Sequence, residues 1–273
     1  WLNDDDLFSR TYPMDVRPQG QDIIRTWLFS SMVRAHLEFG ENPWKHATIS
    51  GWILDPDHKK MSKSKGNVVT PMGLLEKHGS DAVRYWAASA RLGVDAAFDE
   101  QQMKIGRRLA MKVLNASKFA LSMAGEGAAV DLDPAAVTEP VDRAILAGLA
   151  KVVEDATAAF EAYDHTRALE VSETYFWTFC DDYLELVKDR AYSEAPTAKS
   201  AQVALNIAVD TFLRLLGVGA SFLRWRHIYE APSQETGAHA PDEAAGCRKV
   251  SPIAQRRNRR PWEGVANRTC GEL

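Results

Sequence analysis

The feature that most constrains the fold is a change of periodicity near Asp99. Before it, short apolar segments that suit strands flank a helical segment. After it, apolar residues recur at helical spacing, and no segment suits a strand. Strand–helix–strand order is typical of an α/β fold with a parallel sheet, and successive helices with short connections are typical of a bundle. The sequence therefore predicts an α/β part followed by an all-α helical bundle.

The α/β part begins with a short strand at Met14–Val16, and the segment Ala47–Leu54 reads as a second, buried strand. A helix between them carries one apolar stripe, formed by Ile24, Leu28, Met32, Ala35 and Phe39. This β-α-β unit should be parallel and right-handed. Two strands cannot bury both faces of a helix-covered sheet. We therefore expect about half of a Rossmann-type domain, in a chain that begins in mid-fold.

A lysine-rich run, residues 57–67, follows the second strand. Four lysines occupy seven positions, two serines lie among them, and the run ends on Gly66-Asn67, a turn-forming pair. Loops at the carboxyl ends of strands are where α/β sheets bind phosphates, and ammonium groups there can neutralise charge on a departing phosphate. The alternative interpretation is a solvated linker or a localisation patch.

A second candidate site lies at Gly20-Gln21-Asp22, where the β-α-β unit would hold a nucleotide. A glycine lets backbone approach a ligand closely, and a carboxylate just beyond it can accept hydrogen bonds from ribose hydroxyls. The alternative is an ordinary helix start, with Asp22 at the positive end of the helix dipole.

The helical part carries candidate contacts for a phosphate backbone. A helix predicted over Ser80–Leu92 places arginines opposite its apolar face, namely Arg84 and Arg91. In the helix predicted over Gln101–Met123, a basic and polar arc lies beside the buried arc; its members are Lys104, Arg108, Lys112 and Asn115. Any solvent-facing helix can show such an arc, which is the alternative interpretation.

Three further helices are predicted at Val141–Tyr163, Thr166–Ala191 and Thr197–Leu216. The second of these carries five aromatic residues that we assign to core packing rather than to base stacking: Tyr175, Phe176, Trp177, Phe179 and Tyr183. Beyond Leu216 prolines and glycines are frequent and neither apolar period persists, and we expect disorder beyond about Arg226. The basic run at Arg256–Arg260 could instead be a nucleic-acid tail.

The net charge of −4 excludes a globally basic nucleic-acid binder, so any such surface must be local. Three widely spaced cysteines suggest neither a disulfide framework nor a zinc knuckle, and no protein-bound metal is expected. There is no signal peptide and no apolar run long enough to span a bilayer. A cytoplasmic location without membrane contact fits these observations.

Residues Lys60-Met61-Ser62-Lys63-Ser64 reproduce the Lys-Met-Ser-Lys-Ser motif of class I aminoacyl-tRNA synthetases, and the similarity continues through Val69. The flanks Arg17–Trp27 and Gly79–Gly93 resemble the valyl branch, with isoleucyl and leucyl types as the nearest relatives. The resemblance extends from Trp1 to about Leu216.

The resemblance implies ATP-dependent attachment of valine to tRNA(Val) through valyl-adenylate, with Mg²⁺ entering on the ATP. Lys60 and Lys63 would meet the β- and γ-phosphates, assisted by Met61, Ser62 and Ser64. Other implied contacts are to adenosine, from Gly20, Asp22, Trp52 and Ile53, and to tRNA, from Arg84, Arg91, Lys104, Arg108, Lys112 and Asn115.

The resemblance also defines four regions: 1–57, the carboxyl-terminal half of the catalytic Rossmann fold; 58–98, the lysine loop and connecting helix; 99–226, the anticodon-binding bundle; and 227–273, a disordered or unrelated tail. The family's His-x-Gly-His segment, editing domain and carboxyl-terminal coiled coil do not occur. We therefore expect a fragment that is inactive alone. The alternatives are a non-catalytic tRNA-binding fragment and one subunit of a split synthetase that needs the missing amino-terminal half.

Overall fold

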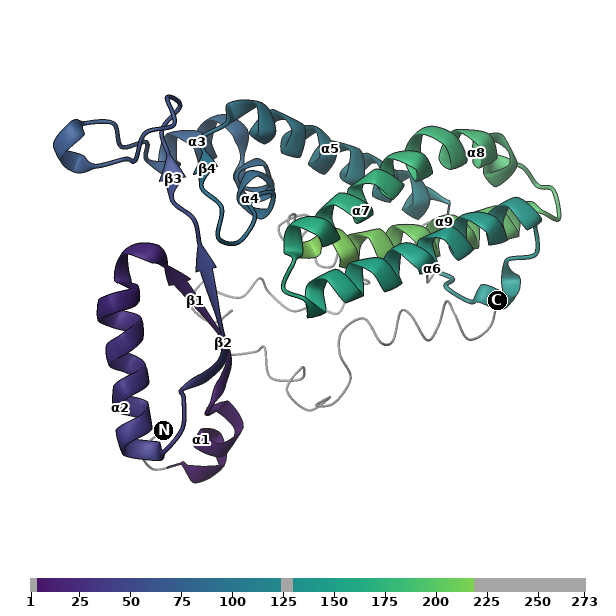
Figure 1. Cartoon of the computed structure of the whole chain (residues 1–273). Coiled ribbons are helices and arrows are strands. Elements are labelled where there is room, and N and C mark those ends of the chain that lie inside the picture. The colour runs from purple at the N-terminus through teal and green to yellow at the C-terminus, as the bar shows by residue number, and fades with distance from the viewer. Residues whose placement is uncertain (1–3, 124–129, 219–273) are drawn as a thin grey trace, which may run out of the picture. The chain divides into compact units, whose positions relative to one another are not determined.

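The computed structural model describes residues 4–123 and 130–218, which form two compact units (Figure 1). The described part of the first unit comprises residues 4–77 and 89–102. That of the second unit comprises residues 78–88, 103–123 and 130–218. The disorder predicted beyond residue 226 lies outside the described residues. No helix among the described residues is both long and apolar enough to cross a membrane.

The first unit contains the strands and the lysine loop. Its elements are α1 (Asp5–Thr11), β1 (Met14–Gly20), α2 (Phe29–Phe39), β2 (Trp44–Ser50), β3 (Ile53–Leu54), α3 (Pro71–His78, whose last residue belongs to the second unit) and β4 (Ala96–Ala97), with 3-10 turns at Gln21–Ile23 and Lys63–Lys65 and a π-helical turn at Ile24–Leu28. β1 pairs parallel with β2 across the α2 connection, with Gly20 opposite Ser50. The predicted β-α-β unit is confirmed.

The predicted strand 47–54 is in fact two strands in two separate sheets. β2 ends at Ser50, and β3 instead pairs parallel with β4. At the break, a Cβ added to Gly51 would lie 2.0 Å from the carbonyl oxygen of Val94. Only glycine allows this approach of two backbone segments, so the chain leaves the first sheet at this residue.

The prediction that this segment is buried is wrong for most of its residues. In β2 only Trp44 is buried, and Ala47 is exposed. The apolar stripe predicted for the helix between the strands is also incomplete, since Leu28 and Ala35 are buried but Phe39 is half exposed. One helix on two strands cannot cover both faces of a parallel sheet, so apolar side chains remain at the surface of this unit.

The regular elements of the second unit are all helices in its described residues (Figure 1). Its helices are α4 (Ser80–Ala88), α5 (Glu100–Ser122, whose first three residues belong to the first unit), α6 (Pro140–Glu161), α7 (His165–Thr178), α8 (Leu184–Tyr192) and α9 (Ala198–Leu215), and 3-10 turns lie at Pro134–Ala136 and Leu216–Val218. The predicted bundle is confirmed, with one difference: a π-helical turn at Phe179–Tyr183 divides the predicted helix Thr166–Ala191.

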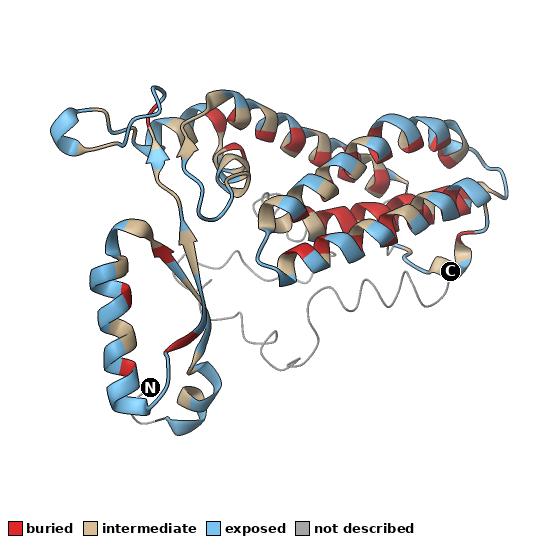
Figure 2. Ribbon diagram, in the orientation of Figure 1, coloured by how far each residue is buried: buried red, intermediate tan, exposed pale blue. Residues whose placement is uncertain are grey.

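The core of the bundle is built around α9, which Figure 2 shows as the most continuously buried helix. Phe176, Phe179 and Phe212 are fully buried, and their ring centroids lie 5.1–6.4 Å apart. Tyr175 and Trp177 are half buried at the edge of this cluster. The aromatic residues are therefore core packing, as predicted.

α4 ends at Ala88 rather than at the predicted Leu92. Its buried residue is Ala82; Tyr85 is half buried, and Ala87 is exposed. Arg91 consequently lies in the turn after the helix and belongs to the first unit, while Arg84 belongs to the second. The prediction that one helix carries both arginines is wrong.

Candidate functional site

Three segments that are distant in the sequence meet at the carboxyl end of β1. The Lys60 ammonium lies 2.8 Å from a carboxylate oxygen of Asp22 and 3.9 Å from the centroid of the Trp52 ring. Asp22 comes from the 3-10 turn after β1, Trp52 from the break between β2 and β3, and Lys60 from the start of the lysine loop. The structure thus brings together one residue from each candidate nucleotide-binding segment.

This contact is open to solvent and can exchange partners. The side chains of Lys60 and Asp22 are each about half exposed, so the ion pair between them is weak. A ligand phosphate could replace the carboxylate as the partner of the ammonium group. Gly20 has open space on its Cβ side, so ligand or backbone could approach it. Ile53, the residue after Trp52, is half exposed.

The tip of the lysine loop is a capped turn. Ser62 Oγ accepts from the Lys65 N–H at 3.3 Å and lies 3.2 Å from Ser64 Oγ. Gly66, at φ 67°, closes the turn in the left-handed region that favours glycine. Met61 turns back, and its sulfur accepts from the Val69 N–H. Lys63 is exposed at the start of the 3-10 turn, where a ligand could reach its ammonium group.

Two residues not predicted as functional hold the base of this loop. Asp55 is only 6% exposed and accepts from the Asp57 and Lys59 N–H groups and from the Asn67 side-chain amide. These hydrogen bonds, led by the one from Asn67, lower the pKa of the Asp55 carboxyl. In the sequence, only the place of Asp55 at the end of a strand and of Asn67 after a glycine could have indicated that these residues hold the loop.

The polar arc predicted on α5 is present, but its charges are partly neutralised. Lys104, Arg108 and Asn115 are exposed. Lys112 lies 3.0 Å from an Asp181 carboxylate oxygen, and this hydrogen bond raises the pKa of Lys112. The guanidinium of Arg108 lies 5.8 Å from the centroid of the Trp177 ring. A phosphate would therefore meet two unneutralised cations here rather than three.

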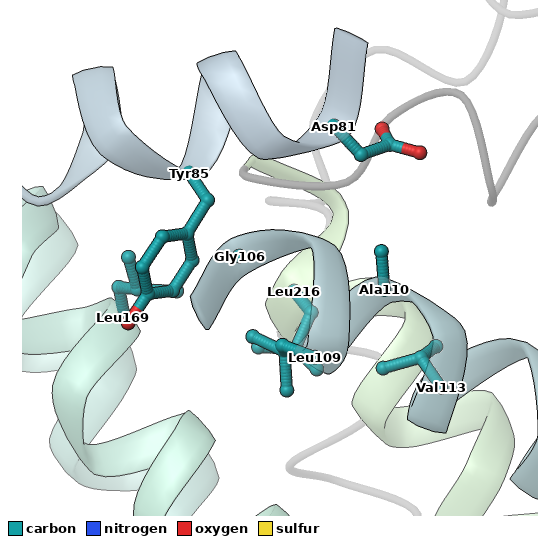
Figure 3. Close-up of a pocket in the computed structure, with 8 residues that line it drawn as sticks. All are labelled: Asp81, Tyr85, Gly106, Leu109, Ala110, Val113, Leu169 and Leu216. Atoms are coloured by element: carbon teal, nitrogen blue, oxygen red, sulfur yellow. The ribbon is translucent and has the colours of Figure 1, made fainter. Parts of the chain in front are cut away.

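The second unit also contains a small hollow (Figure 3). Its lining is mostly apolar: Asp81, Tyr85, Gly106, Leu109, Ala110, Val113, Leu169 and Leu216. None of the predicted tRNA contacts lines it. Among residues 4–123 and 130–218 there is no cluster of three or more His, Cys, Asp or Glu side chains that could hold a metal ion.

Both parts of the chain match known protein families. Residues 2–99 match the class I tRNA synthetases (I, L, M and V), and residues 142–231 match the anticodon-binding domain of tRNA ligase. The latter match continues past Leu216, where the resemblance was predicted to end. These findings confirm the synthetase resemblance and show that it is longer than predicted.

Several curated relatives are valine–tRNA ligases. That of Thermobifida fusca is 62% identical over 89% of this chain and 29% of its own length. That of Leifsonia xyli subsp. xyli is 65% identical over 79% of this chain and 25% of its own length. The chain therefore spans about a quarter of the length of these relatives, so it is similar to one portion of each.

The fold is also similar to solved synthetase structures. A ternary complex of Agrobacterium radiobacter K84 leucyl-tRNA synthetase with tRNA matches 82% of this chain at 19% identity and a TM-score of 0.62; the match covers 27% of that protein. Mycobacterium tuberculosis methionyl-tRNA synthetase with methionyl-adenylate matches 83% at 24% identity and a TM-score of 0.63, covering 46% of that protein. At these identities the similarity establishes the fold class, α/β followed by a helical bundle.

Proposed function

We propose that this chain, which carries a class I tRNA synthetase domain followed by an anticodon-binding domain, is part of an enzyme that attaches valine to tRNA(Val). The convergence of Lys60, Asp22 and Trp52 supports the ATP chemistry, because a flexible cation lies beside the two side chains that we propose to contact the adenosine. The 62% and 65% identity with valine–tRNA ligases supports valine as the amino acid. Isoleucine or leucine is the alternative substrate.

In the proposed reaction a valine carboxylate oxygen attacks the α-phosphorus of Mg-ATP. The bond from that phosphorus to the bridging oxygen breaks, so valyl-adenylate forms and pyrophosphate leaves. A ribose hydroxyl at the 3′ end of tRNA then attacks the valyl carbonyl and releases AMP. Lysine suits the first step because it is a flexible point charge that can follow the departing pyrophosphate.

We assign roles to the site residues accordingly. Lys60 would exchange Asp22 for the β- and γ-phosphates, and Lys63 would join it when the loop closes. Asp22, released from Lys60, would accept from the ribose hydroxyls, while Gly20, Trp52 and Ile53 flank the adenosine. Met61, Ser62 and Ser64 shape the loop, and the Ser64 hydroxyl is left to donate to a phosphate oxygen.

The whole enzyme would include a partner for the exposed apolar side chains of the first unit. Phe29 is 64% exposed and Leu37 80% exposed, and Trp27 and Phe39 are at least half exposed. An unpaired two-stranded parallel sheet with such residues needs further strands and helices to cover it. We propose that the missing catalytic half provides them, either in one longer chain or as the partner of a split synthetase.

The proposed domain division follows the sequence: the carboxyl-terminal catalytic half at 1–57, the lysine loop and connecting helix at 58–98, the anticodon-binding bundle at 99–226 and a tail at 227–273.

The cytoplasm, where protein synthesis consumes charged tRNA, is the proposed location. A non-catalytic tRNA-binding fragment is the second candidate function, and the exposed cations of α5 favour it if no catalytic half exists.

The test of the proposed function is amino-acid-dependent ATP–pyrophosphate exchange by the complete enzyme. Valine should drive exchange at least about tenfold better than isoleucine or leucine, since one added methylene in an apolar pocket is worth about 1–3 kcal/mol. This chain alone should give no exchange. Exchange driven best by isoleucine or leucine would contradict the valine assignment, and absence of exchange with any amino acid would support the tRNA-binding fragment.

Contact between α5 and tRNA gives a separate prediction. Replacing Lys104 and Arg108 with alanine should weaken tRNA binding and flatten the log–log salt dependence by about 0.7–0.9 for each phosphate that the variant no longer neutralises. Lys112→Ala should change the slope less, because Asp181 already neutralises Lys112. Binding can be followed by fluorescence anisotropy at several salt concentrations.

The matched control for Lys112→Ala is Lys188→Ala on α8, because Lys188 is also paired with a carboxylate, 3.6 Å from Glu185, and lies on another helix of the same unit. An unchanged slope in the Lys104→Ala/Arg108→Ala variant, or an equal effect of the Lys188 control, would show that the phosphates are bound elsewhere.

A further inference from the structure

We infer that Asp55 and Asn67 are positioning residues, which hold Lys60 where it meets the phosphates. This inference rests on the proposed function and adds two residues to its machinery. The two side chains form what we call the Asp55–Asn67 clasp, in which the Asn67 amide donates to Asp55 Oδ2 at 2.7 Å. The clasp joins the end of β3 to the end of the loop, twelve residues later.

The Asn67 side chain also binds the backbone of the loop on both sides of Met61. The Asn67 amide nitrogen donates to the Lys60 carbonyl at 3.3 Å, and its oxygen accepts from the Ser62 N–H at 2.9 Å. Both the nitrogen and the oxygen of the Asn67 side chain are therefore bonded within the loop. One asparagine thus holds the backbone on both sides of Met61, next to Lys60.

Asp55 fixes the opposite side of the same lysine. Its Oδ1 accepts from the Lys59 N–H at 2.8 Å, and its own N–H donates to the Lys59 carbonyl at 2.9 Å. Residue 60 also forms an isolated antiparallel bridge with Leu54. The backbone before and after Lys60 is thereby anchored to β3, while its side chain stays free to move between Asp22 and a ligand.

Isosteric exchange of these two residues makes the clasp testable. Asn67→Asp keeps the oxygen that faces Ser62 but removes the amide donor and places a second carboxylate against Asp55, so the clasp should open. In the complete enzyme we expect this variant to lower kcat for valine-dependent pyrophosphate exchange about tenfold, with the KM for valine unchanged. Thr70→Asp adds the same charge at an exposed position nearby and should have no such effect.

Two double variants separate positioning from simple loss of stability. Asp55→Asn with Asn67→Asp restores an amide–carboxylate pair in the reverse direction, so it should recover a large part of the activity that Asn67→Asp removes. In an enzyme that already carries Lys60→Ala, adding Asn67→Asp should lower kcat little further, because the clasp acts through that lysine. The inference would be overturned if the losses of kcat from Asn67→Asp and Lys60→Ala were additive. It would also be overturned if the reversed pair had a kcat no higher than that of Asn67→Asp alone.

Limited trypsin digestion tests the clasp on this chain without any activity. The Lys60 carbonyl belongs to the bond that trypsin would cut, and Asn67 binds it. Asn67→Asp should therefore raise cleavage after Lys60 relative to cleavage after Lys63 and Lys65, and Thr70→Asp should not. If exchange is absent but this cleavage changes, the proposed function fails while the clasp stands; unchanged cleavage would overturn the clasp itself.

Discussion

Alanine at Lys63 should slow valine-dependent ATP–pyrophosphate exchange by about 10²-fold, the scale of removing one preorganised electrostatic interaction from a transition state. The charge that Lys63 meets grows as pyrophosphate departs, so kcat and kcat/KM should fall together, with little change in the KM for ATP. The affinity for valine should stay constant, because the loop acts at the phosphate end of the nucleotide. Lys60→Ala should reduce exchange to a similar extent.

The neighbouring lysines provide matched controls for this measurement. Lys59 lies 3.6 Å from Asp57, and Lys65 is exposed, and neither is paired with Asp22 or Trp52. Both should tolerate alanine far better than Lys60 and Lys63. The experiment is an alanine scan of the four lysines in the complete enzyme. Equal losses at all four positions would show that the loop acts as a diffuse basic patch, and the roles assigned within it would be wrong.

Replacing Asp142 with alanine should destabilise the helical unit by about 3 kcal/mol or more, because it leaves a partly buried cation without its partner. Asp142 is fully buried in the first turn of α6. Its carboxylate accepts from Tyr183, Arg190 and Ser200, which lie in the π-helical turn, α8 and α9. Burial and the nearby carboxylate raise the pKa of Tyr183, so this tyrosine remains a donor.

The measurement is urea unfolding of the whole chain followed by helical circular dichroism. Asp210→Ala is the matched control: Asp210 pairs with Arg214 one turn later on α9 and is partly exposed, so its removal should cost about 0.5 kcal/mol or less. If Asp142→Ala fails to fold, Asp142→Asn, which keeps the shape but not the charge, should unfold at a lower urea concentration than the unsubstituted chain. Equal midpoints for Asp142→Asn and the unsubstituted chain would contradict the role of this carboxylate.

Long helices were predictable to within two residues at each end. The predicted Gln101–Met123 is Glu100–Ser122 in the structure, and the predicted Thr197–Leu216 is Ala198–Leu215. An apolar period of 3.6 residues that is sustained over about five turns is a local pattern that fits a helix and no other secondary structure. By contrast, α4 spans only Ser80–Ala88, and its end was predicted four residues too late. A helix this short is stabilised mainly by tertiary packing, which a local pattern does not record.

By itself, the sequence determined the two-part architecture, the parallel β-α-β unit and the three segments that form the candidate site. Hydrophobic periodicity and motifs can be read within short continuous segments, so these features did not depend on knowing the tertiary structure. Only the tertiary structure decided that the strand breaks at Gly51, that Lys60 pairs with Asp22 and that Asn67 clasps Asp55. The Lys60–Asp22 pair joins residues 38 positions apart, and the clasp joins residues 12 positions apart. Contacts at such separations depend on how the fold brings two segments together in space. Hydrophobic periodicity predicts local secondary structure only, so it could not predict these contacts.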